Sequence, residues 1–275
     1  MARDAPTGVG STAVGVAAMR AWESTRPDRL FEDPLAAEFV AAAGWERPRM
    51  DDVAPEGRAA LRRMASWVSA RTRFLDDLLL DATAGGVRPV VLLGAGLDAR
   101  AFRLDWPDGV RLFELDTAEM LGFKQRVLAE AGARARCERV VIPTDLRGDW
   151  PAALRAAGFD PAAPVAWVIE GLLVYLDEDG VDWLMQGVAA LSAPGSRLGL
   201  TASSSASIDS WRSTVGEGVS ELWVSALPEA PEPWLAGYGW IASTYDSRDR
   251  LAAYGRTVPE REPGSAPSWL IDARR

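Results

Sequence analysis

A repeated alternation of short apolar runs and helical segments in the middle of the chain constrains the fold more than any other feature. The first run, Pro89–Leu93, is apolar throughout, as expected for a strand that is buried on both faces. Four similar runs follow, at residues 111–116, 139–142, 164–169 and 197–201. Helical patterns separate them. This alternation predicts an α/β fold with a Rossmann-like, doubly wound, mostly parallel sheet.

The segments before and after this core are predicted to belong to the same domain, residues 1–275. Residues 1–84 are expected to form a helical N-terminal cap, with a helix start at Asp33-Pro34, because aspartate caps helices and proline suits the first turn. The cofactor-binding core would cover residues 85–203. Residues 204–275 are expected to extend the sheet with two strands, near 240–245 and 268–273, after a helix and a proline-rich turn from Pro228 to Pro233.

One predicted helix carries an arginine where an apolar residue is expected. Between residues 59 and 80 the apolar side chains recur at helical spacing, at Leu61, Met64, Val68, Leu75 and Leu78. Arg71 falls on the same stripe. An arginine that a helix directs inward needs a buried anion or another polar partner.

Charge and composition exclude several classes of protein. The net charge is −9 and the arginines are interleaved with acids, whereas nucleic-acid binders need a basic face, so we expect no nucleic-acid partner. We also expect a cytoplasmic protein without a membrane partner, because no stretch is apolar enough to span a bilayer or to act as a signal peptide. Without histidine and with one cysteine, Cys137, the usual zinc ligands are missing, and we expect no metal. A small-molecule or peptide substrate remains; the oligomeric state is unknown at this stage.

Polar or small residues follow four of the predicted strands. Gly94 and Gly96 come after the first, Asp116 ends the second, Asp145 follows the third and Glu170 follows the fourth. In an open α/β sheet, ligands bind outside the carboxyl ends of the strands. We therefore expect a nucleotide site there, with an acid of the second strand (Asp116, or Glu114 two residues earlier) on the ribose.

Each of these residues also has a purely structural interpretation. The two glycines could form an ordinary turn, and Asp116 or Asp145 could cap the helix that follows it. Glu170 is harder to explain in this way. It lies between two apolar segments, so we expect it to be buried and to need a cationic or hydrogen-bonding partner. Four coincident signals favour a binding site.

The number of acids indicates which nucleotide binds. A nicotinamide cofactor would use the glycines and one acid after the second strand, which leaves Asp145 and Glu170 without a role. S-adenosylmethionine presents an adenine amine, ribose hydroxyls, an ammonium group and a carboxylate. The acids that follow three of the strands suit the adenine amine, the ribose hydroxyls and the ammonium group. Arg71 suits the carboxylate. The residues therefore favour S-adenosylmethionine.

Nine segments spread over nearly the whole chain form a joint pattern. They are Thr12–Ser24, Leu30–Pro34, Ala70–Arg73, Val91–Leu104, Phe113–Asp116, Asp145–Leu146, Glu170–Leu176, Trp234–Trp240 and Tyr254–Arg256. Through them the chain resembles the leucine carboxyl methyltransferase family, in particular its bacterial relatives. Ala99 and Leu115 depart from the pattern, where threonine and valine are more usual.

The resemblance implies a class I methyltransferase fold, S-adenosylmethionine as cofactor, and roles for individual residues. At the methionyl end, Arg71 would bind the carboxylate with Arg20 as a second basic residue, and Glu170 would bind the same end of the cofactor. Gly94 and Gly96 would line the cofactor.

The nucleoside end and the acceptor receive the remaining roles that the resemblance implies. Asp116 would bind the ribose, and Asp145 and Leu146 would contact the adenine. Tyr175 would face the methyl acceptor, which makes it the candidate catalytic residue.

The missing histidines bear on the acceptor. A carboxylate, with a pKa of about 4, is nucleophilic at neutral pH without a base, whereas a phenol, with a pKa near 10, usually needs one. We therefore expect O-methylation of a carboxylate in a small molecule or peptide, and the resemblance implies the same, with secondary metabolites as one substrate class. Three alternatives stay open: a hydroxyl or phenol O-methyltransferase that uses an acid, a tyrosine or Lys124 as base, an NAD-dependent oxidoreductase, and a regulatory module without catalysis.

Overall fold

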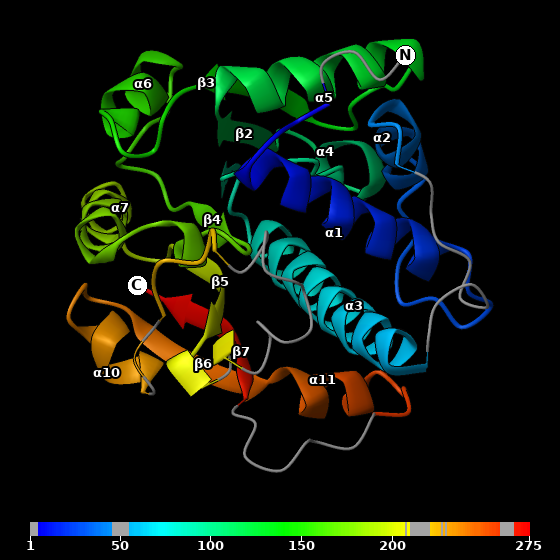
Figure 1. Cartoon of the computed structure of the whole chain (residues 1–275). Helices are drawn as coiled ribbons and strands as arrows, with labels where there is room; N and C mark the ends of the chain where they lie inside the picture. Colours follow the sequence, from blue (N-terminus) through cyan, green and yellow to red (C-terminus); the bar gives the residue numbers. More distant parts are fainter. Residues whose placement is uncertain are drawn as a thin grey trace.

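A mostly parallel sheet forms the centre of the protein (Figure 1). The computed structural model describes residues 5–45, 55–206, 208–209, 221–226, 228, 230–258 and 267–275. Within these ranges seven strands pair in the order β3-β2-β1-β4-β5-β7-β6. The parallel ones are β1 (Pro89–Leu93), β2 (Arg111–Asp116), β3 (Glu138–Pro143), β4 (Ala166–Ile169) and β5 (Arg197–Ser203), while β6 (Ile241–Asp246) and β7 (Ser268–Arg274) run antiparallel to their neighbours. The predicted Rossmann-like fold is confirmed.

Helices cover both faces of this sheet. One face packs against α3 (Pro55–Ala84) and α11 (Ser247–Ala253), the other against α6 (Trp150–Ala156), α7 (Glu178–Ala190) and α10 (Pro231–Ala236). A third apolar cluster joins α1 (Val9–Ser24), α2 (Ala36–Ala42) and α5 (Ala118–Glu130) to the loop after β1. The short α4 (Arg100–Arg103) and the 3-10 helix η2 (Leu173–Tyr175) follow β1 and β4. No helix in these ranges is long and apolar enough to cross a membrane.

The apolar run of β1 is explained by its central position. Val90 and Leu92 face the α3 side of the sheet, whereas Val91 and Leu93 face the α7 side, and all four are at most 2% exposed. Parallel neighbours on both edges bury the backbone as well. Because β2 lies on one side of β1 and β4 on the other, their carboxyl ends leave a crevice at the point where the strand order reverses.

The termini of two helices differ from the prediction. The helix expected from Asp33-Pro34 begins at Ala36, although the Asp33 Oδ1 atom does accept a hydrogen bond from the Ala36 amide (3.1 Å). The expected turn at Pro228–Pro233 is wrong from Pro231 onward, since Pro231 begins α10. Proline lacks only an N–H group that has no partner in a first helical turn, so it can start a helix as readily as end one.

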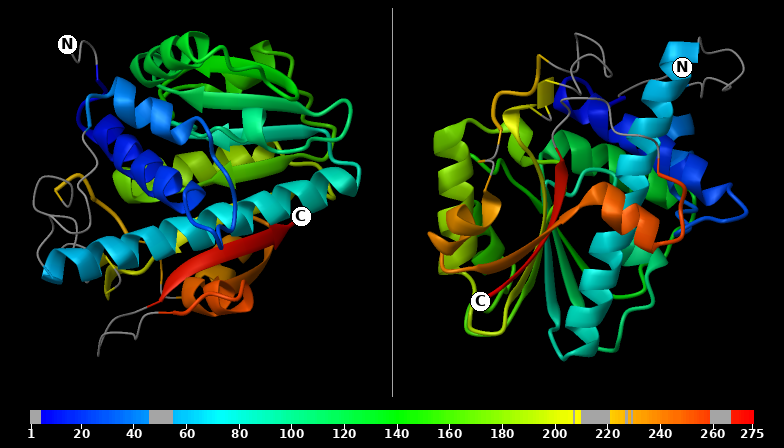
Figure 2. Two further views of the ribbon diagram at one scale, coloured as in Figure 1. Left: turned by 90° about the vertical axis from the view of Figure 1, so that its right-hand side faces the viewer. Right: turned by 90° about the horizontal axis from the view of Figure 1, so that it is seen from below.

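Helix α3 has two functions along its length. Figure 2 shows it running between the N-terminal helices on one side and the C-terminal strands on the other. Its later residues, including Leu75 and Leu78, pack on the sheet, so this half of the predicted cap is part of the α/β layer itself. Its earlier residues reach the carboxyl edge of the strands, where the polar residues gather.

Candidate functional site

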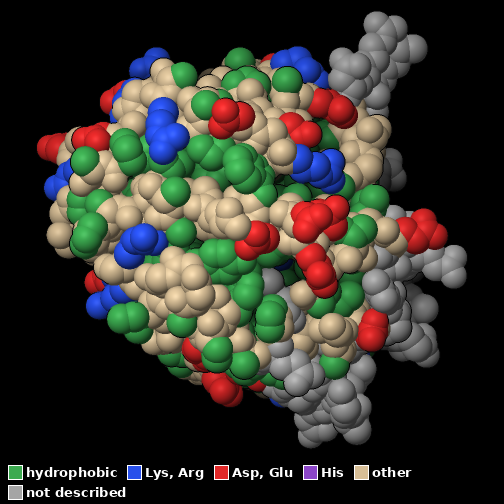
Figure 3. Space-filling view, turned by 90° about the vertical axis from the view of Figure 1, so that its left-hand side faces the viewer, with side chains coloured by type: hydrophobic (Ala, Val, Ile, Leu, Met, Phe, Trp, Pro, Cys, Tyr) green, Lys and Arg blue, Asp and Glu red, His purple; other side chains and the backbone are tan. Residues whose placement is uncertain are grey.

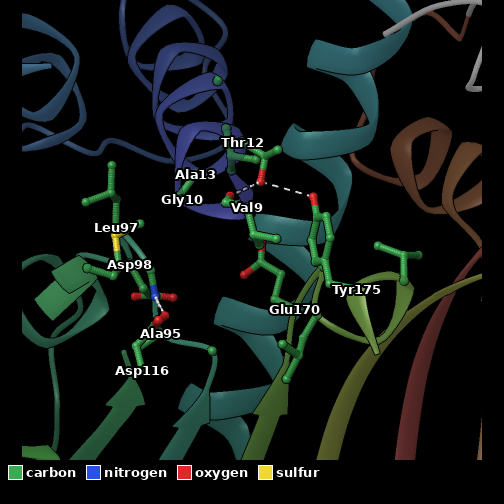
Figure 4. Close-up of a pocket in the computed structure, with 18 of the residues that line it drawn as sticks. Val9, Gly10, Thr12, Ala13, Ala95, Leu97, Asp98, Asp116, Glu170 and Tyr175 are labelled. Atoms are coloured by element: carbon green, nitrogen blue, oxygen red, sulfur yellow. Dashed lines mark hydrogen bonds between the residues drawn. The ribbon is translucent and has the colours of Figure 1, made fainter. Parts of the chain in front are cut away.

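A cavity of about 790 Å³ opens at the carboxyl ends of β1, β2 and β4. Figure 4 shows Ala95, Asp98 and Asp116 on one side of it, Glu170 and Tyr175 on the other, and α1 across it. The register explains why they meet, because Leu93 lies beside both Leu115 of β2 and Ile169 of β4. All nine candidate site residues line this cavity: Arg20, Arg71, Gly94, Gly96, Asp116, Asp145, Leu146, Glu170 and Tyr175.

The glycine loop and Asp116 form one unit. The Gly96 amide donates to Asp116 Oδ2 (2.7 Å), and the Thr117 amide donates to Oδ1 (2.7 Å). Gly94 and Gly96 have φ values of 68° and 43°, which favour glycine, and a Cβ on Gly94 would lie 3.0 Å from Leu172 Cδ1. Asp116 does not cap the next helix, because the Thr117 side chain does so. Burial raises the pKa of Asp116, and the two amide donors oppose that shift.

Glu170 is held by three arginines. Its Oε1 atom accepts from Arg20 Nη2 (2.8 Å) and Arg71 Nε (2.9 Å), and its Oε2 atom accepts from Arg100 Nη1 (2.7 Å). Burial by itself would raise the pKa of Glu170, but the charges of Arg20, Arg100 and Arg71 outweigh it and hold the pKa far below its usual value. The expectation that Glu170 is buried and needs cationic partners is confirmed, since its side chain is only 8% exposed.

Arg71 is inward-facing, as its place on the α3 stripe predicted. Its residue exposure is 8%, and its guanidinium lies over the Trp67 ring, 5.7 Å from the centroid. Within the described residues only Nε donates, to Glu170, so both terminal nitrogens can serve a ligand. Burial lowers the pKa of Arg71 in spite of the neighbouring Glu170. The site would therefore be stabilised by a second anion.

Asp145 and Leu146 lie at the other end of the cavity, after β3. The Asp145 side chain is exposed and accepts from the Arg147 amide (2.9 Å), while Leu146 is buried. The alternative role as a helix cap belongs to Asp149, which accepts from the Ala152 amide at the start of α6. Asp145 thus presents a carboxylate, and Leu146 an apolar surface, to whatever occupies this end.

Tyr175 connects the strand side of the cavity to α1. Its hydroxyl donates to Thr12 Oγ1 (3.0 Å), which in turn donates to the Val9 carbonyl (2.7 Å; Figure 4). The phenolic proton is therefore already used in a hydrogen bond to another part of the protein.

Two residues that the sequence left as candidates do not reach the cavity. Glu114 is fully buried and binds Lys124 Nζ (2.8 Å) and Arg139 Nη2 (2.6 Å). The ribose acid of the second strand is therefore not Glu114, and Lys124 is not available as a base. Neither residue lines the cavity, and both are held inside the protein by the ion pairs of Glu114 with Lys124 and Arg139.

Sequence reasoning missed Arg100. Its fully buried guanidinium joins Glu170 to Asp76 (Nε–Oδ1 2.7 Å) and Asp98. The charges of these acids overcome the effect of burial and raise the pKa of Arg100 well above its usual value. The only signal in the sequence was a charged residue directly after the glycine loop, in a short segment where no helical stripe could be read.

With this geometry in place, comparison with known proteins identifies the family. Residues 13–189 match the profile described as leucine carboxyl methyltransferase. The chain belongs to this family. It is 53% identical over 259 residues to a Frankia alni protein that is provisionally named an S-adenosyl-L-methionine-dependent methyltransferase, covering 92% of this chain and 90% of that protein. A Streptomyces avermitilis protein with the same provisional name is 51% identical over 278 residues, covering 98% and 96%.

Solved structures show the same fold at low sequence identity. A DUF574 family protein from Streptomyces avermitilis has a TM-score of 0.58 at 14% identity, covering 94% of this chain and 96% of that one. A protein from Thermobifida fusca, provisionally named a methyltransferase, has a TM-score of 0.52 at 16% identity and covers 94% of each chain.

Membership of the leucine carboxyl methyltransferase family decides the cofactor. This chain is an S-adenosylmethionine-dependent methyltransferase, and the nicotinamide alternative is wrong. The acid-rich edge of the sheet supports the same conclusion, because Asp145 and Glu170 line the cavity as well as Asp116.

Proposed function

We propose that this methyltransferase transfers a methyl group to a carboxylate oxygen of a small molecule or peptide. The observation that carries the proposal is that histidine, the most common general base, is missing from the chain and that no lysine is among the described residues lining the cavity. Among the described residues that line the cavity, the ionisable side chains are acids, arginines and Tyr175, and Tyr175 already donates its proton to Thr12. The chain has no histidine. A carboxylate is ionised at neutral pH and needs no proton acceptor.

We also propose how the cofactor lies. The terminal nitrogens of Arg71 would pair with the methionyl carboxylate, with Arg20 beside them. Glu170 would accept from the ammonium, because an ionised carboxylate has about four lone-pair sites and three are used here. The bound cofactor would supply the electrophilic methyl group.

The nucleoside would occupy the opposite end of the cavity. Asp116 would accept from the ribose hydroxyls next to the glycine loop of Gly94 and Gly96, and Asp145 and Leu146 would contact the adenine. Since such a transfer is an in-line displacement, the protein mainly contributes alignment and a water-poor site. Helix α1 and Tyr175, which line the cavity, would enclose the reacting end and keep water from it.

A small acceptor also fits the surface. On the face shown in Figure 3, the Lys and Arg side chains are scattered among Asp and Glu and hydrophobic groups. The protein carries a net charge of −9, which opposes binding to nucleic acid. These features support a small-molecule or peptide acceptor, with secondary metabolites as one class.

Asp116→Ala is expected to weaken binding of S-adenosylhomocysteine by about 1.5–3 kcal/mol, the range for a hydrogen bond to a charged group. Calorimetry measures the change, and a thermal midpoint for the same sample reports whether the glycine loop is still folded. Asp105→Ala is the control, because the Asp105 side chain is 94% exposed. Unchanged affinity in Asp116→Ala would remove this residue from the ribose site.

The acceptor itself is tested by the stability of the product. A methyl ester is cleaved by mild alkali and releases methanol, whereas an aryl methyl ether survives. We also expect the rate of the chemical step, measured with cofactor and acceptor bound, to rise through roughly pH 4–5 and then to stay flat across neutrality, because the acceptor carboxyl must be ionised to react. An alkali-stable product, with a rate that still climbs above pH 7, would favour the hydroxyl or phenol alternative instead.

A further inference from the structure

In the part of the cavity beyond the proposed cofactor contacts, the side chains that the structure describes are uncharged. Its walls come from α1, the first half of α3, η2, the end of β5 and Trp223, and among the described residues none of these contributes a charged side chain apart from Arg20 and Arg71 at the cofactor. We call this region the acceptor lobe. Tyr175 is its only ionisable member among those residues, with hydroxyls such as Thr12 as the other polar groups.

At the acceptor lobe, the first half of α3 turns apolar side chains toward the cavity and charged side chains away from it. Leu61, Met64 and Trp67 line the cavity, whereas the neighbouring Arg62 and Arg63 do not. Leu61 and Met64 belong to the apolar stripe, yet they are only partly buried, because within the described chain they face the cavity and not the sheet. Exposing an apolar helix face of this kind to water is unfavourable in free energy. An apolar ligand that covers the face removes this penalty.

The apolar surface continues from the lobe to the outside. Val9 of α1 and Trp45 both line the cavity and are 44% and 48% exposed, which places them among the few large apolar side chains at the surface of the described chain. Trp45 lies against α1, with its ring 3.7 Å from where a Cβ on Gly15 would be. A ligand that fills the lobe can therefore extend along apolar contacts toward solvent.

From these observations we propose that the acceptor has an uncharged, apolar body, which lies along Leu61, Met64 and Trp67, and that its reacting group is its only charge near the cavity. This inference rests on the proposed function for the nature of that reacting group only. A second charge on the acceptor would find no charged partner among the described residues of the lobe, whereas the cofactor's sulfonium attracts the single carboxylate that reacts.

The probes for this proposal are straight-chain monocarboxylic acids from four to twelve carbons, titrated into the protein saturated with S-adenosylhomocysteine. We expect the affinity to rise about fourfold for each methylene until the lobe is filled, because burying one methylene is worth about 0.8 kcal/mol. Dicarboxylic acids of equal length should bind at least tenfold more weakly. A flat length series, or dicarboxylates that bind as well as the monoacids, would overturn the proposal.

A matched pair of variants on one helix locates the effect. Leu61→Ala should lower the affinity for the longest acid about tenfold, since it removes part of the apolar wall. Leu80→Ala makes the same change at the far end of α3, outside the cavity, and should not alter it. The affinity for S-adenosylhomocysteine shows whether each variant is folded, and Met64→Ala replaces Leu61→Ala if the latter does not fold. Equal losses in the cavity variant and in Leu80→Ala would overturn the assignment.

Alkylphenols with the same tails separate this inference from the carboxyl proposal. If the phenols show the length dependence and the acids are not methylated when S-adenosylmethionine is the cofactor, the carboxyl assignment fails and the apolar lobe stands. If neither series depends on tail length, the apolar lobe is wrong, whichever group is methylated.

Discussion

Replacing Glu170 with glutamine is expected to cost about 3–5 kcal/mol of folding free energy and to abolish measurable binding of S-adenosylhomocysteine. The variant keeps the shape of the side chain but leaves Arg20, Arg71 and Arg100 without their shared anion in a buried site. In addition, the amide NH₂ group is a donor that would face guanidinium donors. Urea denaturation measures the first effect and calorimetry the second.

The destabilisation caused by Glu170→Gln is expected to depend on pH. The arginines hold the pKa of Glu170 well below the value of about 4.3 that a glutamate has in an unfolded chain. Its contribution to stability is therefore fully present above about pH 4.3 and is lost as the pH falls from there toward the folded pKa. The difference in unfolding free energy between wild type and Glu170→Gln should shrink as the pH is lowered through this range.

Glu138→Gln is the matched control for Glu170→Gln. Glu138 also accepts from an arginine, Arg111 (2.7 Å), but its side chain is 64% exposed, so the pair is screened by water. We expect a change of less than about 1 kcal/mol in this control. A similarly small change in Glu170→Gln would show that the three-arginine cluster does not need the charge of Glu170.

Replacing Arg71 with methionine is expected to weaken the binding of S-adenosylhomocysteine by about 2–5 kcal/mol, because one partner of a desolvated ion pair is then missing. Arg71→Lys should recover only part of the loss. An ammonium restores the charge but cannot bind Glu170 through Nε and a carboxylate through two further nitrogens at once. Calorimetry of wild type, Arg71→Met and Arg71→Lys measures both the loss of affinity and its partial recovery.

The control for Arg71 lies two residues further along the same helix. Arg73 is 40% exposed on its side chain, pairs with Asp77 and does not line the cavity. Arg73→Met should leave the cofactor affinity unchanged. Wild-type affinity in Arg71→Met would contradict the assignment of this residue to the cofactor carboxylate and leave it as a partner of Glu170 alone.

Much of the fold and the edge that carries the site could be predicted because both depend on local patterns. A continuous apolar run such as Val90–Leu93 indicates a strand that is buried on both faces, and parallel strands place their carboxyl ends at one edge. Gly94, Asp116 and Glu170 each follow or end such a run, so their convergence was visible without coordinates.

The starts of α10 and α2 were predicted less accurately than the strands. Proline before and within Pro231–Ala236 is compatible with both a turn and a first helical turn, and the choice depends on the packing of Leu235 against the sheet. Between residues 204 and 235, positions 207, 210–220, 227 and 229 lie outside the described residues, so the expected helix of this segment is not tested there.

The strands, their order in the chain, the face of α3 that carries Arg71 and the edge of the sheet that carries the candidate site could all be predicted from the sequence, because periodicity and strand ends are local properties. The ion-pair partners of Glu170 became known from the three-dimensional arrangement. Arg20, Arg71 and Arg100 are separated from Glu170 by 150, 99 and 70 residues, yet all three donate to it. The structure also decided that Leu61 faces a cavity whereas Leu75 faces the sheet. A helical pattern shows which residues share a face, but what covers that face depends on segments that are distant in the chain.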